Sequence, residues 1–429
     1  MTATAIFRLP NELLVAIAAA GQEKRIAETF SQHSRWQTPS ATFKSEWTMS
    51  QLSRRFRAAI IGAPNLWILA EAELEHQGSV EVLKLYLERS QACKISITLR
   101  ESQTSDLEYD HLLDRISLIA AHFNQIQMLR IAITDCRKEM WNLFRDAAAP
   151  VLEHLELINV YNKVGDTVEM FSSGAPKLKF FKLDNFVLDS FSAPWTASLT
   201  HLELLKCPAN TPDLPPIVAQ SPQLIRLHLD TDFDRSGAQV HIPTLEFLHV
   251  VIPNEEDSDY LVAILNLFDT PALTELKIEG SHGDQIAVLF NSTLLTSFPV
   301  LTSLSFLYKG ACGCDSTDDF SYRPIAKSPP LFPTLTSLTL VNQCFIRNLI
   351  PDILGPDAPP RHSLNTVTLY LKDNPEMVVQ NVCIDLEEAG KARRERGDVL
   401  PKVQLFHTVS AFYNWDNGAG LDFEMMSIW

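Results

Sequence analysis

Hydrophobic residues recur along most of the chain in one short phrase: an apolar residue, two others, an apolar residue, one other, and a third apolar residue. The last two apolar positions are two residues apart, so they point to one side of a β-strand, and the first lies at the bend that enters it. One such strand cannot bury its apolar side alone, but stacked copies share a continuous core. The phrase therefore predicts a stack of strands between about residues 122 and 372, with copies at Ile126/Leu129/Ile131, Leu152/Leu155/Leu157, Leu178/Phe181/Leu183, Leu199/Leu202/Leu204, Leu224/Leu227/Leu229, Leu245/Leu248/Val250, Leu273/Leu276/Ile278, Leu301/Leu304/Phe306, Leu335/Leu338/Leu340 and Leu364/Val367/Leu369.

The segments between the phrases indicate what the strands pack against. The first residues of successive copies lie 21 to 34 residues apart, which leaves room for a connecting element. Segments 208–222 and 310–333 are rich in Pro, Gly and Ser and are predicted to be loops. Strands that alternate with helices favour an α/β fold in which helices cover one side of a parallel sheet. Apolar residues at helical spacing predict helices at Lys138–Ala148, Asp257–Phe268, Asp284–Phe290 and Pro375–Ala389.

The phrase resembles the leucine-rich repeat, in ten degenerate copies. This resemblance implies an α/β leucine-rich-repeat solenoid over about residues 122–410, with parallel strands on its concave face and helices or loops on its convex face. Ninth from the first leucine, the family usually has Asn or Cys, whose hydrogen bonds form a ladder. That ladder is expected to be largely absent here, because the positions hold Val160, Phe186, Cys207, Asp232, Pro253, Ser281, Lys309 and Gln343.

Two amphipathic helices are predicted ahead of the repeats. In the first, Pro10 suits the opening turn and Glu12 favours its positive end, and the apolar side holds Leu13, Leu14 and Ile17. The second helix is predicted over Met49–Ile61, where Thr48 and Gln51 match a capping box and Gly62 and Pro64 come after the end. Its apolar stripe consists of Met49, Leu52, Phe56 and Ile60, and three arginines, Arg54, Arg55 and Arg57, lie off that stripe.

Three short motifs in this region resemble an F-box: Leu9-Pro10-x-Glu12-Leu13-Leu14-x-x-Ile17, Leu52-Ser53-Arg54-Arg55-Phe56-Arg57 and Ala63-Pro64-x-Leu66-Trp67. The Val82–Leu99 stretch is similar to the segment after the box in many fungal F-box/leucine-rich-repeat proteins. The resemblance implies a small all-α module at residues 1–70, with an insertion at about 18–47, that binds a Skp-type adaptor of a cullin-RING ubiquitin ligase. The residues that would contact the adaptor are Leu9, Pro10, Leu13, Leu14, Ile17, Leu52, Phe56, Leu66 and Trp67.

An F-box followed by leucine-rich repeats implies a substrate-recognition adaptor, in which the box joins the ligase and the repeats hold a target protein. The alternative is a stand-alone repeat scaffold for protein interactions, whose F-box has diverged and lost its function. Between these parts, residues 71–121 are predicted to form linking helices and a first strand. The aromatic tail at 411–429 is expected to cap the array or to enter its concave face.

The residues that flank the apolar strand positions predict a second binding surface, for a substrate, on the concave side of the sheet. The alternative interpretation is a solvated sheet face that is polar without binding anything. Four histidines lie on this surface, but residues two repeats apart stand roughly 10 Å from one another, so no metal site is expected. The candidate substrate-binding residues are His154, Glu156, Lys182, His201, Glu203, Arg226, His228, His249, Glu275 and Lys277.

Charge narrows the classes of partner. The chain of 429 residues has a formal net charge of −16, which disfavours a nucleic-acid footprint, and 46% hydrophobic residues, which suits a folded core. Residues 1–70 hold 8 basic and 4 acidic side chains, a net of +4, and the remainder holds 28 and 48, a net of −20. The two parts are therefore expected to face different partners. The mixed charges of Lys391–Arg396 are predicted to lie on an exposed helix.

Motifs that carry catalysis are missing from the sequence. It has no glycine-rich phosphate loop, no nucleophile elbow and no His-Glu-x-x-His, so neither an enzyme activity nor a cofactor is expected. Seven scattered cysteines favour a reducing intracellular location, cytoplasmic, nuclear or both. The longest apolar stretches, Leu13–Ala20 and Leu261–Leu265, are too short to cross a bilayer, so no membrane partner is expected.

Overall fold

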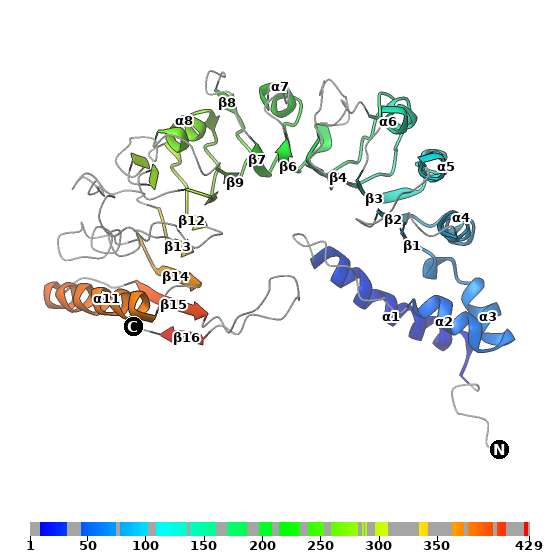
Figure 1. The fold of residues 1–429 in the computed structure, drawn as a ribbon, viewed down its shortest axis with the longest axis horizontal. Coiled ribbons are helices and arrows are strands. Elements are labelled where there is room, and N and C mark those ends of the chain that lie inside the picture. The colour runs from blue at the N-terminus through cyan, green and yellow to red at the C-terminus, as the bar shows by residue number, and fades with distance from the viewer. Residues whose placement is uncertain are drawn as a thin grey trace, which may run out of the picture. The chain divides into compact units, whose positions relative to one another are not determined.

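The chain is an α/β protein with a large parallel sheet, as seen in a computed structural model (Figure 1). It divides into two compact units: unit 1 is Met1–Phe181 with Ala193–Thr196, and unit 2 is Lys182–Ser192 with Ala197–Trp429. The boundary falls inside strand β5 (Phe180–Asp184). The structure describes residues 9–31, 44–73, 78–101, 109–134, 138–159, 170–186, 197–207, 214–231, 239–252, 259–281, 285–286, 288–289, 297–307, 334–341, 363–372, 376–397, 401–408 and 424–427.

Unit 1 begins with helices, but they differ from those expected. Helix α1 starts directly after Pro10 and continues well into the expected insertion, and the single helix predicted over Met49–Ile61 is wrong, because two helices meet at Ser53. Ser53 is extended (φ −161°), and its hydroxyl accepts a hydrogen bond from the Phe56 N–H, so it caps the second of them. The expected capping box also fails, because Thr48 lies inside a helix. The elements are α1 (Asn11–Ser31), α2 (Ser45–Leu52), α3 (Arg54–Ile61) and the 3-10 helix η2 (Pro64–Leu66).

Small residues and buried hydrogen bonds hold these helices together. A Cβ on Gly21 would lie 3.0 Å from the Ser45 side chain, so α1 and α2 approach closely there. The Ser45 hydroxyl donates to the Ala18 carbonyl at 3.0 Å, and the buried Gln22 amide donates to the Leu66 carbonyl. Glycine and alanine in α1 therefore permit the contact that places α2 against it.

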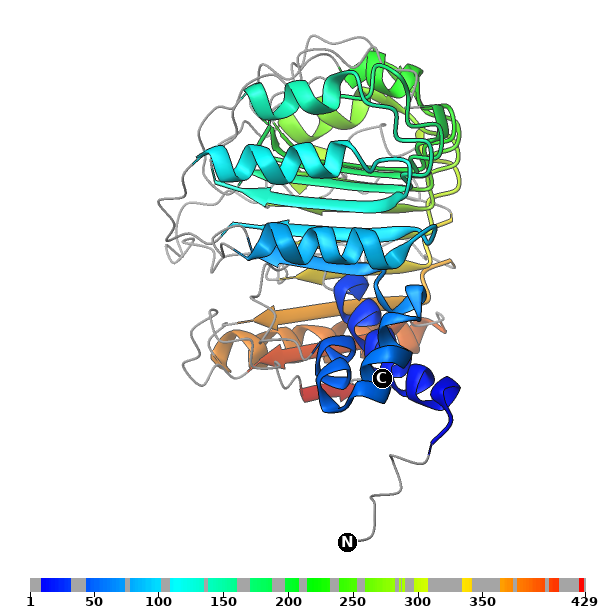
Figure 2. The same cartoon turned by 90° about the vertical axis from the view of Figure 1, so that its right-hand side faces the viewer.

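Four parallel strands of unit 1 come after the helical part, with helices between them. The strands pair in chain order, and Figures 1 and 2 show α4, α5 and α6 on one side of them. Helix α6 confirms the helix predicted at Lys138–Ala148. The elements are β1 (Leu69–Glu73), α4 (Ser79–Ser90), β2 (Ile95–Arg100), α5 (Tyr109–Ala120), β3 (Ile126–Ile133), α6 (Lys138–Arg145) and β4 (His154–Asn159).

Unit 2 continues the pattern with strands that pair in chain order. All are parallel except the last, β16 (Glu424–Ser427), which pairs antiparallel with β15. The strands before it are β6 (His201–Cys207), β7 (Arg226–Thr231), β9 (Phe247–Val251), β11 (Glu275–Glu279), β12 (Ser303–Leu307), β13 (Ser337–Val341), β14 (Thr366–Lys372) and β15 (Lys402–Thr408). A separate parallel pair is formed by β8 (Val240–His241) and β10 (Phe268–Asp269).

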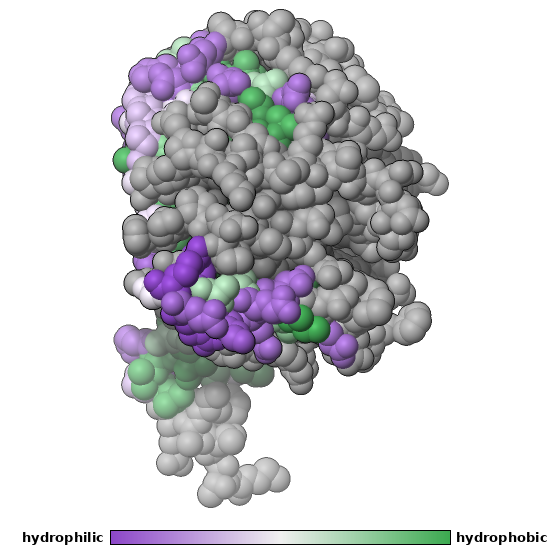
Figure 3. Space-filling model, turned by 90° about the vertical axis from the view of Figure 1, so that its left-hand side faces the viewer, coloured by the Kyte–Doolittle hydropathy of each residue, from purple (hydrophilic) through white to green (hydrophobic). Residues whose placement is uncertain are grey.

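The helices of unit 2 correct one prediction and confirm others. Segment 208–222 was expected to be a loop, but it contains α7 (Leu214–Ala219), because Leu-Pro-Pro at its start suits the first turn of a helix. Helices α8 (Tyr260–Asn266) and α11 (Glu376–Arg396) confirm two predicted helices, and α11 reaches past Ala389 to include the charge run. Figure 3 shows a largely hydrophilic surface over α11, although Arg393 within it is buried. The expected loop at 310–333 lies outside the described residues.

The apolar phrase accounts for the core of both units. Every first, second and third apolar position of the ten copies is buried, with exposed fractions of 6% or less. Neighbouring copies are also in register: Leu276 pairs with Leu248 on one side and with Leu304 on the other. Because side chains alternate along a strand, the residues between these positions point to the opposite side, which we call the open face of each unit.

A ladder of threonine hydroxyls runs across the strand entrances of unit 2. Thr274 Oγ1 donates to the Glu246 carbonyl at 3.0 Å. Thr302 Oγ1 donates to the Thr274 carbonyl at 3.1 Å, and Thr336 Oγ1 to the Thr302 carbonyl at 3.1 Å. Each of these carbonyls also accepts backbone N–H groups; that of Thr274 takes those of Thr302 and Ser303 at 2.9 and 3.0 Å. Of the ninth positions, the described ones, Phe186, Cys207 and Ser281, are buried.

Candidate functional site

The expected adaptor-binding residues divide into exposed and buried groups. Leu13, Ile17 and Leu52 are exposed by 49%, 47% and 53%, Pro10 is exposed and Leu9 partly so. In contrast, Leu14, Phe56, Leu66 and Trp67 have exposed fractions of 0%. The last four side chains pack the module from within, so only the first five offer surface to a partner.

Helical periodicity explains this division. On α1, Leu14 and Ala18 are four residues apart and point into the module, whereas Leu13 and Ile17 form the neighbouring row and point outward. Trp67 is held inside, since its indole N–H donates to the Ile60 carbonyl at 3.0 Å and its ring meets Tyr86 edge-on at 5.3 Å between centroids.

Two of the three arginines on α3 make contacts within the module. Arg55 Nε donates to Asn11 Oδ1 at 3.1 Å, and a terminal nitrogen of Arg55 donates to the Leu9 carbonyl, which ties the start of α1 to α3. Arg57 Nε donates to the Ser50 carbonyl at 3.1 Å. Arg54 is exposed at the start of α3. Arg55 and Arg57 therefore position the exposed apolar side chains as well as adding positive charge.

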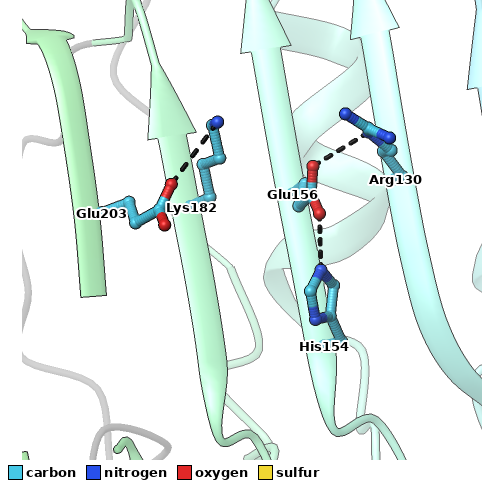
Figure 4. Close-up of polar contacts among 5 residues, drawn as sticks. All are labelled: Arg130, His154, Glu156, Lys182 and Glu203. Atoms are coloured by element: carbon cyan, nitrogen blue, oxygen red, sulfur yellow. Dashed lines mark hydrogen bonds and ion pairs between the residues drawn. The ribbon is translucent and has the colours of Figure 1, made fainter. Parts of the chain in front are cut away.

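On the open face of unit 1, a buried cluster of charges joins β3 and β4. Arg130 Nε lies 2.9 Å from Glu156 Oε2, and His154 Nε2 lies 2.6 Å from Glu156 Oε1 (Figure 4). The side chains of Arg130 and Glu156 are only 7% and 5% exposed. Burial and the charge of Arg130 lower the pKa of Arg100 on β2. Glu156, expected to bind substrate, is therefore occupied by contacts within the sheet.

The ring of His154 is also covered. It stacks on Phe180 with 4.1 Å between centroids and 2° between planes. Both residues lie in the first open-face row of unit 1, so this stacking extends the buried cluster along the sheet. His154 can therefore contribute an edge to a partner, but not a ring face on the Phe180 side.

Unit 2 begins its open face with a second ion pair. Lys182 Nζ lies 3.4 Å from Glu203 Oε2 (Figure 4). Burial raises the pKa of Asp184, which the nearby Lys182 and Lys206 partly oppose. His201 lies on the same face, with its Nδ1 2.9 Å from Thr200 Oγ1. The pair therefore occupies one cation and one carboxylate at this end of the unit.

Strands β7, β9 and β11 bring five of the expected residues together. The rings of His228 and His249 stack at 4.0 Å, and His249 Nε2 lies 3.3 Å from Glu279 Oε2. One row earlier, the Arg226 guanidinium lies 4.0 Å from the centroid of Phe247. Lys277 pairs with Glu275 at 3.3 Å and also approaches Phe247.

The open face changes character after β11. The first three open-face positions of β12, β13 and β14 carry no charge, whereas β7 and β11 carry several. Tyr370 and Phe406 close the third row by stacking at 4.6 Å. The hydroxyl-bearing positions are Ser303, Ser305, Ser337, Thr339, Thr366 and Thr368.

Two arginines of these clusters, Arg130 and Arg100, were not among the candidates. Arg130 nevertheless stands between the second and third apolar residues of the first copy, Leu129 and Ile131. Glu156 was selected because it lies between the second and third apolar positions of its copy, and Arg130 lies at the same place in the first copy. The sequence therefore contained the information needed to predict Arg130. Arg100 precedes the first copy, and only the pairing of β2 with β3 reveals that it shares their open face.

Comparison of the chain with known proteins yields no match. No protein-family model matches the chain, and no curated protein matches it either. Among the described residues, no group of three or more His, Cys, Asp or Glu side chains is arranged to hold a metal ion. Within the same part of the chain, every helix is too short or too polar to span a membrane.

Proposed function

We propose that the chain is a leucine-rich-repeat solenoid with an F-box-like module at its N-terminal end, and that it is a substrate-recognition adaptor of a Skp–cullin–F-box ubiquitin ligase. The observation that carries the proposal is the exposure of Leu13, Ile17 and Leu52 ahead of a repeat array with regular register. Large apolar side chains that remain half-exposed on a small helical module are suited to a protein contact.

The proposed mechanism is proximity. The helical module binds a Skp-type adaptor and so joins a cullin-RING ligase, while the open face of the repeats holds the target protein. A target held near a charged ubiquitin-conjugating enzyme gains the rate advantage of an intramolecular reaction. In this proposal the chain itself breaks and forms no bonds.

The exposed fractions of Leu13, Ile17 and Leu52 determine how much binding free energy these side chains can contribute. Burying a fully exposed Leu or Ile contributes about 1.5–3 kcal/mol, and these three are half-exposed, so each contributes roughly 1 kcal/mol on docking. Together they are worth roughly 3 kcal/mol, which corresponds to about a hundredfold change in Kd.

Affinity of the purified chain for a purified Skp-type adaptor tests the proposal. The triple variant Leu13→Ala/Ile17→Ala/Leu52→Ala should bind about a hundredfold more weakly with an unchanged circular dichroism spectrum. Ile384→Ala is the matched control, because Ile384 is equally exposed, at 52%, but lies on α11 in unit 2. Equal affinity of the triple variant and the control would refute the docking surface.

A stand-alone repeat scaffold is the second candidate. The burial of Leu14, Phe56, Leu66 and Trp67 favours it, since four of the nine side chains expected at the adaptor interface are used for internal packing. The same binding measurement separates the two functions: a wild-type chain that does not bind the adaptor, yet binds peptides through unit 2, is a scaffold.

A further inference from the structure

One cation on the open face of unit 2 lies against an aromatic ring. Arg226 on β7 is exposed, and its guanidinium lies 4.0 Å from the centroid of Phe247, its register neighbour on β9. Among the described residues, no carboxylate pairs with it. The Phe247 ring lies against the guanidinium carbon, and a guanidinium carries five N–H donors in the planar fork that matches a carboxylate.

The surroundings of Arg226 carry a small net negative charge. The nearby open-face cations Lys182, Arg226 and Lys277 contribute +3, and the carboxylates contribute −5, a net of −2 with neutral histidines. Three of the carboxylates are already paired: Glu203 with Lys182, Glu275 with Lys277, and Glu279 with His249. The carboxylates in this sum are Asp184, Glu203, Asp230, Glu275 and Glu279.

This balance distinguishes between possible anions. A phosphate ester carries about two negative charges at neutral pH and a carboxylate carries one, so every charge of this face acts on the phosphate about twice as strongly. Because carboxylates outnumber cations here, the net repulsion is larger for the phosphate. A run of several acidic residues meets the same repulsion. The arrangement therefore suits a single carboxylate on Arg226, with the stacked His228 and His249 in the next row beneath the bound chain.

The strands next to β7 determine which residues of a bound peptide can lie near its carboxylate. From β7 to β12 the sheet advances three strand steps, β7 to β9, β9 to β11 and β11 to β12, or about 14 Å at roughly 4.8 Å each. An extended peptide covers that distance in about four residues. It then lies over the uncharged hydroxyl rows of β12, β13 and β14, where a charged side chain would lose water without gaining a partner.

We propose that this face of unit 2 binds an extended segment of the target protein with one Asp or Glu on Arg226 and uncharged residues about four positions away. The binding of such a segment is independent of the function proposed above. Only the statement that the bound protein is a substrate rests on that function. Binding of the segment needs no ligase component, because every residue that would contact it belongs to this chain.

Selection from a random peptide display library on the immobilised full chain tests the proposal. Enriched peptides should share one Asp or Glu and an uncharged segment about four residues from it. Arg226→Ala should abolish that enrichment, and Arg226→Lys should keep it in weaker form, because lysine retains the charge but not the fork. Lys402→Ala is the matched control, since it removes another exposed cation from the first open-face row.

Synthetic versions of an enriched peptide give the quantitative result. Replacing its Asp by Asn should weaken binding about tenfold or more, the value of a hydrogen-bonded charge. Phosphoserine at that position should bind more weakly than Asp. Absence of enrichment, enrichment independent of Arg226, or tighter binding of phosphoserine would each overturn the proposal. None of these outcomes depends on the Skp-type adaptor, so failure here leaves the adaptor test intact, and the reverse also holds.

Discussion

The pair Arg130–Glu156 offers a direct test of whether Glu156, which was predicted to bind substrate, acts in folding instead. We consider Arg130→Met, Glu156→Leu and the double variant. The two side chains lie 2.9 Å apart with exposures of 7% and 5%, so either single change leaves a charge buried beside apolar strands. Breaking such a buried pair typically costs about 3–5 kcal/mol, whereas replacing both partners with apolar residues is often close to neutral.

The neighbouring charges raise the expected cost of losing Glu156. Arg130 also lies near Arg100, whose pKa it helps to lower, so removing the carboxylate leaves two cations facing each other. Lys94–Glu153 is the matched control in the same unit: its ion-pair distance is also 2.9 Å, but its side chains are 45% and 27% exposed. Exposed pairs contribute about 0–1 kcal/mol, so Lys94→Met should have a small effect.

Urea denaturation followed by circular dichroism and tryptophan fluorescence measures these differences. Each single variant should lose about 3–5 kcal/mol of unfolding free energy, and the double variant should lose much less than the sum. Additive losses, or a Glu156→Leu variant no worse than Lys94→Met, would show that the cluster does not stabilise the sheet. Glu156 would then be available to a partner as the sequence suggested.

Two further changes test the packing of unit 2. Gly280→Ala should lower the free energy of unfolding by about 2 kcal/mol or more, because Gly280 has a φ of 85° and a Cβ there would lie 2.3 Å from the Ile252 carbonyl oxygen. Lys206→Gly is the control that should not destabilise, since Lys206 already has a positive φ of 50°. Equal urea midpoints for the two variants would contradict the reasoning. Cys207 should resist iodoacetamide at about pH 8 in the native chain, because burial raises the pKa of its thiol to about 12 and leaves little thiolate. Peptide mapping should find the partly exposed Cys93 modified before Cys207, and comparable rates for these two cysteines would be the opposing result.

The strands were predictable because their signal is repeated. A single Leu-x-x-Leu-x-Leu phrase is weak, but ten copies fix both the strands and their register, and Leu248, Leu276 and Leu304 are aligned as the phrase requires. Helix boundaries were less accessible. The apolar stripe from Met49 to Ile60 continues across Ser53, so periodicity alone could not locate the break that the Ser53 cap produces.

The candidate surfaces were only partly predictable, for a different physical reason. A motif identifies residues that belong to a module but does not separate those that pack it from those that remain outside, and Leu13 and Leu14 illustrate both outcomes in adjacent positions. The alternation of side chains along each strand predicted which residues lie on the open face. It did not predict which of those side chains form ion pairs with one another. Only distances distinguish the buried Glu156, which pairs with Arg130, from the exposed Arg226, which lies against the ring of Phe247.

The threonine ladder also bears on how such a chain can change length during evolution. Glu246 and Thr274 are 28 residues apart, as are Thr274 and Thr302. Deleting residues 274–301 would place the Thr302 hydroxyl opposite the Glu246 carbonyl, so the hydrogen bond would re-form between new partners. An error of one residue would instead exchange the inward and outward sides of the strand. Duplication or loss of whole 28-residue blocks is thus a route by which this protein could lengthen or shorten its open face while keeping the rest of the array.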